Sequence, residues 1–157
     1  MKDNVINWAN ERKLVKRENA TKQVFKLIEE SNEIFQGYLK NDVDLIKDGI
    51  GDTQVVIIIL LKQLSIEKDI KPFSLIFEDI ESSLFEFNKA ISNAVFSYKY
   101  VYRCEKISDS SLCIALGHLK NIAEYYESSL EECLELAWNE IKDRQGITVN
   151  GTFIKNQ

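Results

Sequence analysis

The sequence predicts an all-α fold, a helical bundle of about five or six helices with a small C-terminal β-hairpin. The chain of 157 residues contains one proline and six glycines, too little turn-forming material for an all-β domain. Apolar residues recur every three or four positions along much of the chain, which is the spacing of one buried helical face. A chain of this length supports one core, so we expect residues 1–157 to form a single domain.

The first predicted helix covers residues 21–39. Its apolar positions step by three and four along one face, and they are Val24, Leu27, Ile28, Ile34, Phe35 and Tyr38. Glu29 and Glu33 fall on the side away from this stripe and Glu30 at its flank, with Glu33 within one turn of both others. The three carboxylates are therefore expected to share an edge of the helix.

The next segment, residues 42–64, contains the apolar run VVIIILL at 55–61. Its β-branched residues would also suit a buried strand. A helix is favoured because no turn signal follows Gly51 and because a helix that is apolar all round suits the centre of a bundle. Gly49 and Gly51 each weaken such a helix by about 1 kcal/mol relative to Ala, or they let another backbone or a ligand come close.

Pro72 ends this element and can occupy the first turn of the next one. Apolar spacing over residues 73–105 predicts one long helix, or two helices broken near Ser92 and Asn93. The aromatic residues of this region either pack in the core or form a subunit interface. They are Phe85, Phe87, Phe96, Tyr98, Tyr100 and Tyr102.

Two more helices and a hairpin complete the prediction. Ser108 or Asp109 caps the first of these helices and Ser128 or Ser129 the second, whose end is expected at Gly146. The alternating tail contains the pair Asn150-Gly151, which favours a type I′ turn. The terminal hairpin is therefore predicted at about residues 147–155.

The charge and cysteine content narrow the range of functions. A net charge of −5 argues against a general nucleic-acid binder, because phosphate backbones are held by excess Lys and Arg. No apolar run approaches the roughly 20 residues of a membrane helix, and the N-terminus lacks an apolar signal core. Three cysteines without a CxxC pair suit a reducing compartment. These features predict a cytoplasmic protein with no nucleic-acid or membrane partner.

Acidic residues form a second cluster at Asp48 and Asp52, which share a helical face at a separation of four. Two antiparallel helices would aim these two and the pair Glu30 and Glu33 at one point. Hard carboxylate oxygens without a His or Cys partner suit Mg²⁺ or Mn²⁺, which proteins hold with a few carboxylates plus substrate phosphates. A solvated acidic face is the alternative, and spacing alone leaves the two interpretations about equal.

Two motifs add a family resemblance. EESNE at 29–33, followed by KDGIGDTQVVIII at 47–59, resembles the E-E-x-x-E and E-x-x-D signature of MazG-type, all-α nucleoside triphosphate pyrophosphohydrolases. KQVFKLIEESNEIFQGYLKND and AWNEIKDRQGITVNG are similar to segments of small MazG-like proteins of phages and bacteria. The resemblance extends from about Trp8 to the hairpin, although residues 73–102 carry no motif.

The resemblance implies hydrolysis of a nucleoside triphosphate, or a deoxynucleoside triphosphate, to its monophosphate and pyrophosphate. Divalent metal binds the triphosphate and helps activate a water, a chemistry that needs charge neutralisation more than a protein nucleophile. Carried over, Glu30 and Glu33 are ligands from the first helix and Asp52 is the final Asp. Glu29 matches the leading Glu, which either binds a second ion or orients the water.

One position departs from the family pattern, because Gly49 stands where the Glu of E-x-x-D is expected. Asp48 is adjacent and shares a face with Asp52, so it is the candidate substitute. This exchange leaves the number of metal ions open. It also favours a different class of function, a catalytically lapsed helical interaction protein that keeps the fold. A nearer alternative is a sibling enzyme specialised for dUTP, with a different base pocket and the same metal chemistry.

Further positions match substrate-binding residues of relatives. Asn139, Lys142 and Arg144 correspond to the Asn and basic residues that contact phosphates, although cations placed against the helix dipole explain Arg144 equally well. Lys26 either steers the triphosphate or pairs with Glu30 one turn away. Trp8 and Trp138 could stack on a base, but core packing is the commoner role. Relatives build their sites between associated subunits, which implies a homo-oligomer, dimer or tetramer.

Overall fold

A computed structural model describes residues 1–68, 70–74, 79–98 and 107–156. Within these ranges the chain forms six α-helices and one antiparallel hairpin, which confirms the predicted all-α bundle. The elements are α1 (Lys2–Glu11), a 3-10 turn η1 (Arg17–Asn19), α2 (Ala20–Lys40), α3 (Val43–Gln63), α4 (Ile80–Phe96), α5 (Asp109–Tyr125), α6 (Leu130–Ile141), β1 (Gly146–Val149) and β2 (Thr152–Lys155).

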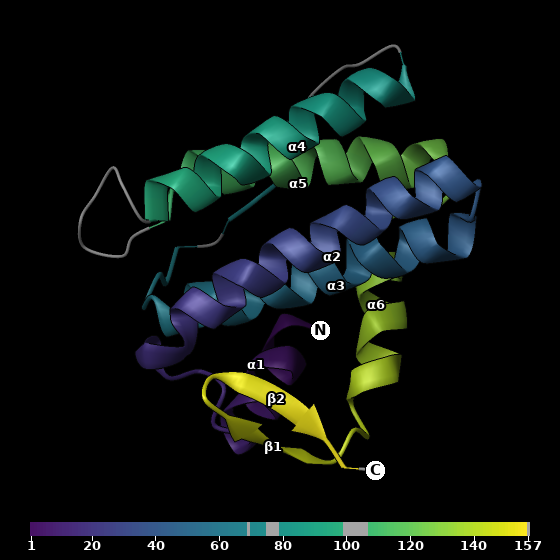
Figure 1. Cartoon of the computed structure of the whole chain (residues 1–157). Coiled ribbons are helices and arrows are strands. Elements are labelled where there is room, and N and C mark those ends of the chain that lie inside the picture. The colour runs from purple at the N-terminus through teal and green to yellow at the C-terminus, as the bar shows by residue number, and fades with distance from the viewer. Residues whose placement is uncertain (69, 75–78, 99–106, 157) are drawn as a thin grey trace.

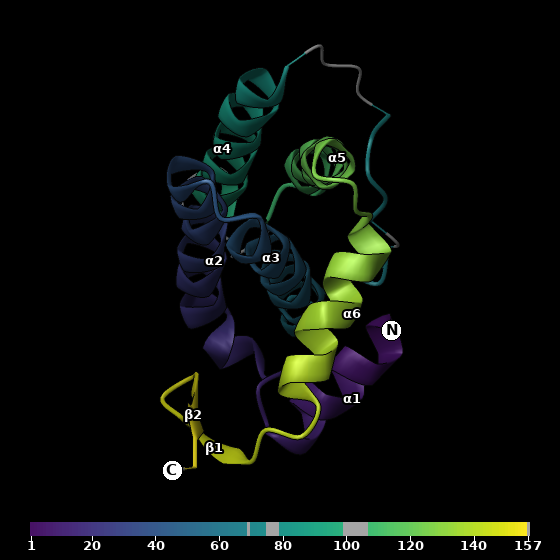
Figure 2. The same cartoon turned by 90° about the vertical axis from the view of Figure 1, so that its right-hand side faces the viewer.

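The antiparallel pair α2 and α3 occupies the middle of the molecule (Figure 1). Helices α4 and α5 cover one side of this pair, and α1 and the hairpin lie at the opposite end. Figure 2 shows α6 running from the end of α5 down to the hairpin. Helix α3 contacts α1, α2, α5 and α6, so it is the central helix of the bundle.

The turn between α2 and α3 is short because both helix ends are capped. Asn41 takes the left-handed conformation with φ 54°, a common way to end a helix. The Asp42 carboxylate then accepts a hydrogen bond of 3.1 Å from the backbone N–H of Leu45, which begins α3. The run at 55–61 is helical, and all of it except Ile58 is buried. The prediction of a helix over a strand is therefore confirmed.

Two glycines of α3 allow neighbouring backbones to come close. A Cβ on Gly49 would lie 2.9 Å from Cγ1 of Ile34 and 3.1 Å from its backbone N. A Cβ on Gly51 would lie 2.2 Å from the backbone oxygen of Cys133, a separation that no pair of such atoms tolerates. Gly49 therefore marks the crossing with α2, and Gly51 marks the crossing with α6.

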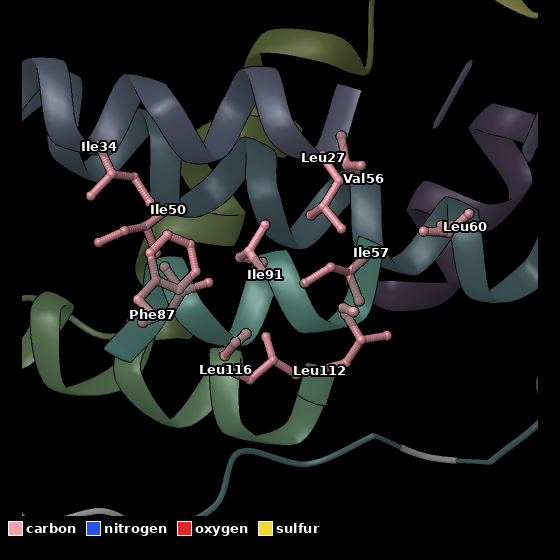
Figure 3. Close-up of a cluster of buried hydrophobic side chains, with 14 of the residues drawn as sticks. Leu27, Ile34, Ile50, Val56, Ile57, Leu60, Phe87, Ile91, Leu112 and Leu116 are labelled. Carbon is pink, nitrogen blue, oxygen red and sulfur yellow. The ribbon is translucent and has the colours of Figure 1, made fainter. Parts of the chain in front are cut away.

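The main core lies between α2, α3, α4 and α5, and Figure 3 shows their side chains meeting. Phe87 is fully buried at its centre and stacks on Phe35 with ring centroids 6.1 Å apart. A second, smaller cluster joins α1 to α3 and α6 through Val5, Ile59 and Ile141. Burial of each large apolar side chain contributes roughly 1.5–3 kcal/mol, so both clusters hold α3 in place.

The prediction for residues 73–105 was wrong about where the helix begins. Helix α4 begins only at Ile80, where the Asp79 carboxylate accepts a 2.6 Å hydrogen bond from the Ser82 backbone N–H. Pro72 therefore lies outside the helix rather than in its first turn. The helix passes through 92–93 without a break, so of the two alternatives the break near Ser92 and Asn93 is the one that the structure excludes. Residues 75–78 and 99–106 lie outside the described part of the chain.

The aromatic residues of this region divide between core and surface. Phe87 and Tyr98 are buried, whereas Phe85 is 73% exposed and Phe96 is 57% exposed. Tyr100 and Tyr102 fall outside the described residues. Core packing is therefore confirmed for Phe87 and Tyr98, whereas a subunit interface stays a prediction.

The later caps and the hairpin agree with the sequence, with one exception. Ser108 caps α5 and Ser129 caps α6, each accepting a backbone N–H three residues on. Asn150 and Gly151 have φ values of 49° and 81°, as a type I′ turn requires. The exception is the end of α6, which was predicted at Gly146. The helix stops at Ile141, and Gly146 instead opens β1, opposite Lys155.

The sequence prediction did not include α1. Its buried residues are Val5, Trp8 and Ala9, which lie on one face of the helix. A stripe of only three residues gives little periodic signal in the sequence. Within the described ranges, no helix combines the length and apolarity that crossing a bilayer would demand.

Candidate functional site

A cavity of about 310 Å³ lies beside the α2–α3 pair, at the end of the molecule where α1, α6 and the hairpin meet. Its wall is charged in one part and mostly apolar in another. The charged residues are Lys26, Glu29, Glu30, Asp52 and Arg144. The apolar residues are Trp8, Leu14, Val55, Val56, Ile59, Ile141 and Phe153, and Gln23, Gly151 and Thr152 complete the wall.

Helix geometry explains why α2 and α3 supply most of the polar groups. Gln23, Lys26 and Glu30 are spaced by three and four residues, so they lie on one face of α2. On α3, Asp52 and Ile59 are two turns apart on one face. Because the two helices are antiparallel, the Glu30 end of α2 lies beside Asp52, and the Gln23 end lies beside Ile59.

Glu30 is the most buried of the predicted site carboxylates, at 6% exposure. The Lys26 ammonium lies 2.6 Å from its Oε1 and 3.0 Å from Oε2 of Glu29. Partial burial acts to lower the pKa of Lys26, but the hydrogen bonds and charges of Glu30 and Glu29 outweigh it and leave that pKa raised. Lys26 therefore stays protonated and pairs with Glu30, which was one of its two predicted roles.

Asp52 is the most perturbed acid of the site. Burial raises its pKa, and the nearby charges of Glu30 and Asp48 raise it further, to about 7. Arg144 acts in the opposite direction and lowers it. A carboxyl group with such a pKa sits in an environment that disfavours its charged form.

Glu33 and Asp48 have raised pKa values for the same kind of reason. For Glu33 the main cause is burial, followed by the charges of Glu30 and Asp48. For Asp48 it is burial, followed by Glu140 and Glu30. Glu30 is thus a common neighbour of Glu33, Asp48 and Asp52. The two acidic clusters lie near enough for their charges to interact, but the predicted convergence of their carboxylates on one point is not found among the described residues.

These acids do not form a closed metal cage. Within the residues that the structure describes, no three Asp, Glu, His or Cys side chains are arranged to hold a metal ion. Glu30 is engaged by Lys26, and Asp48 lines a neighbouring hollow with Asp44 and Glu140. The donor chemistry fits Mg²⁺, because hard oxygens whose charges repel one another gain from a divalent cation.

Gly49 cannot be replaced by the Glu of the family signature without moving α2. Its missing Cβ would already touch Ile34, and the Glu30 backbone oxygen would lie 3.4 Å away. Asp48, the predicted substitute, lies close enough to Glu30 and Glu140 for their charges to raise its pKa. Close packing of α2 on α3 thus gives a physical reason for glycine at this position.

The predicted phosphate-binding residues differ in their position relative to the cavity. Arg144 lines the cavity and forms an ion pair with Glu140. Asn139 and Lys142 are exposed and do not line it, and the Lys142 ammonium donates a 2.8 Å hydrogen bond to the Asn139 side chain. Among the three, the structure brings only Arg144 to the site. Glu29 lies at the cavity as an exposed residue.

Arg12 is a residue of this region that the sequence did not indicate. Its guanidinium donates hydrogen bonds of 3.2 and 2.7 Å to the Arg144 backbone oxygen and one of 3.1 Å to that of Trp8. It also lies 4.6 Å from the centre of the Trp8 ring. The hydroxyl group of Thr148 in β1 donates a hydrogen bond to the Arg12 backbone oxygen. Arg12 therefore ties α1, the segment after α6 and the hairpin together around the cavity.

Comparisons with known proteins give limited information. No protein family profile and no solved structure matches the chain. One curated relative is 47% identical over 64 residues, which are 41% of this chain and 39% of the relative. It is described as an uncharacterized 18.2 kDa protein in the rep-hol intergenic region of Haemophilus phage HP1 (strain HP1c1). The similarity spans well under half of the relative's length, and its description names no activity.

Proposed function

We propose that this protein is a MazG-like nucleotide pyrophosphohydrolase that depends on Mg²⁺, with Mn²⁺ as a substitute. It would hydrolyse ribo- or deoxyribonucleoside triphosphates to monophosphate and pyrophosphate, and so control or clean a nucleotide pool. The observation that carries the proposal is the cavity at which Glu30 and Asp52 lie together with Lys26. Glu33 and Asp48 are near enough for the charge of Glu30 to raise their pKa values. The E-E-x-x-E resemblance supports the same conclusion.

Each group has a distinct part in this proposal. Glu30, Glu33 and Asp52 would hold the metal, with Asp48 in place of the missing family Glu. The metal, when bound, supplies a low-pKa water and neutralises phosphate charge. Lys26 and Arg144, both at the cavity, offset the remaining negative charge of a triphosphate.

Lys26 has two partners at the cavity. Its ammonium pairs with Glu30 and Glu29, so it keeps the buried Glu30 charge paired and would also lie within reach of bound phosphates. Glu29 lies at the cavity as well, where its carboxylate would orient the attacking water.

Association into a homo-oligomer is part of the proposal. A hollow of about 550 Å³ between α2 and α4 is lined mainly by apolar and uncharged residues, and the exposed rings of Phe25 and Phe96 border it. Exposed apolar patches of this kind on a folded protein mark interaction surfaces. The surface also supports the second candidate function, a lapsed helical interaction protein, which Gly49 and the open arrangement of the acids favour.

The two candidates differ in metal binding and turnover. Mn²⁺ binding followed by electron paramagnetic resonance, together with pyrophosphate release, would be measured for the wild type, Glu33→Gln and Asp52→Asn. The proposal predicts that each variant keeps its helical circular dichroism spectrum and loses more than about 100-fold in both measurements. The exposed Glu135 of α6 does not line the cavity, so Glu135→Gln is the matched control and should behave as wild type.

Asp48→Asn tests the substitute ligand. A loss as large as that of Asp52→Asn would establish Asp48 as a ligand, whereas full activity would limit the metal site to the other acids. A folded wild type that neither binds Mn²⁺ nor turns over any nucleotide would favour the interaction protein. Full turnover in both Glu33→Gln and Asp52→Asn would show that the site is misassigned.

A further inference from the structure

Gln23 stands out at the apolar part of the cavity. It is only 6% exposed and lines the cavity wall. Its side-chain amide bonds no other residue in the described part of the chain, and it is not one of the polar groups that are closed off from solvent without a partner. The amide therefore faces the cavity, where it is suited to bond a ligand.

Aromatic rings form part of the same wall. Trp8 and Phe153 meet edge to face, with ring centroids 5.3 Å apart and an interplanar angle of 61°. The indole N–H of Trp8 is buried without a hydrogen-bond partner. Val55 and Ile59 add aliphatic surface. Apolar walls with a few fixed polar groups are typical of small-molecule sites, whose volumes start at about 300 Å³.

The chemistry of an amide limits the ligand. Gln presents one donor beside one acceptor, the pattern that pairs with the edge of a nucleobase carrying an acceptor beside a donor. Aromatic side chains provide surfaces on which a base stacks. The cavity wall around Gln23, Trp8 and Phe153 thus matches a flat heterocycle with a polar edge better than an aliphatic chain.

The position of Gln23 along α2 connects this part of the cavity to the acids. Gln23 precedes Glu30 by seven residues on the same face, which is about 10 Å along the helix axis, and Lys26 lies between them. A nucleotide can span this separation with its base at Gln23 and its phosphates beside Lys26 and Glu30.

We propose that Gln23 reads the hydrogen-bonding edge of a nucleobase held in the part of the cavity formed by Trp8 and Phe153. The proposal assigns the base-recognition residue of the site. It rests on the proposed function only for the claim that the phosphates of the bound nucleotide are hydrolysed. Base binding itself needs neither metal nor hydrolysis, so the two claims can fail separately.

The experiment measures binding of nucleoside monophosphates by isothermal titration calorimetry in EDTA, which removes metal chemistry. The probes are AMP, CMP, GMP and UMP and their deoxy forms. Gln23→Leu should bind the preferred monophosphate about 10-fold more weakly than wild type. Gln36 is exposed on the same helix and does not line the cavity, so Gln36→Leu should bind like wild type.

A second measurement leaves the protein unchanged. Monophosphates methylated on the Watson–Crick edge, such as 1-methyladenosine or 3-methyluridine monophosphate, should bind wild type about 10-fold more weakly than the unmodified form. For the Gln23→Leu variant, methylation of the monophosphate should weaken binding little further, because the hydrogen bonds that the methyl group blocks are already absent. This non-additivity is the signature of a direct contact.

Three results would decide the matter. Equal affinities of wild type and Gln23→Leu, with no effect of methylation, would overturn the inference even if pyrophosphate release is found. Failure of every monophosphate to bind folded wild type would overturn it as well. Binding that depends on Gln23 in a protein without pyrophosphate release would support the inference and refute the hydrolase.

Discussion

Replacing Asp52 by Asn should make the metal-free protein more stable at pH 8. Asp52 is partly buried, and the charges of Glu30 and Asp48 act on it together with that burial to raise its pKa from 3.8 to about 7. Above pH 7 the folded protein therefore carries an ionised carboxylate that its surroundings disfavour. Asparagine has nearly the same shape without the charge, so the substitution removes this cost.

The size of the effect follows from the pKa values. The folded state binds the Asp52 proton more tightly than the unfolded state, so the free energy of unfolding falls as pH rises from about 4 to about 7. A shift of about 3 pKa units at 1.36 kcal/mol per unit gives at most about 4 kcal/mol above pH 7. Water reaches the partly exposed carboxylate and screens it, so we expect about 2 kcal/mol. Below pH 4 the effect should vanish.

Urea unfolding of wild type and Asp52→Asn at pH 4, 6 and 8 measures this difference. With a slope of about 2 kcal/mol per molar urea, the midpoint of Asp52→Asn should lie about 1 M higher at pH 8 and coincide with wild type at pH 4. Asp44 is exposed on the same helix, so Asp44→Asn should stay within about 0.5 kcal/mol of wild type. An Asp52→Asn variant that is equally or less stable at pH 8 would refute the account of crowded carboxylates.

Three further substitutions test the packing that positions the site. Gly51→Ala places a methyl group against the Cys133 carbonyl and should lower the unfolding free energy by about 1–3 kcal/mol or more; a neutral result in urea would mean that α3 and α6 are not in close contact. Phe87→Ala empties the centre of the main core and should cost about 3–5 kcal/mol, seen as a much lower melting temperature, whereas a small change would place Phe87 outside the core. Ser129→Ala removes the cap of α6 and should cost about 1 kcal/mol, measured by urea midpoint, and no loss would show that the cap is dispensable.

Local patterns were sufficient for much of the fold. Helix α2 follows from apolar periodicity, and α3 from a long apolar segment without a turn signal. The two are adjacent in the chain, so the approach of Glu30 to Asp52 could be anticipated once an antiparallel pair was assumed. The pair Asn150-Gly151 fixed the hairpin turn because both positions need positive φ. The start of α4 was missed since apolar spacing over residues 73–79 continues into the helix, and only the cap at Asp79 marks the boundary.

Contacts between distant segments had no signal in the sequence. Arg12 bonds the backbone of Arg144, which is 132 residues away, and neither residue follows a periodic pattern that would reveal the partner. Gln23 was passed over because a polar residue counts against a buried face, although it is buried at the cavity. Polar residues that tertiary packing buries are the part of a site that periodicity predicts least well.

Release of pyrophosphate from a panel of NTPs and dNTPs, dUTP included, with and without Mg²⁺ or Mn²⁺, tests the central claim most directly. The account predicts metal-dependent release of pyrophosphate with a nucleoside monophosphate as the second product, and its loss in Asp52→Asn. Folded, helical wild-type protein that releases no pyrophosphate from any of these nucleotides would contradict it.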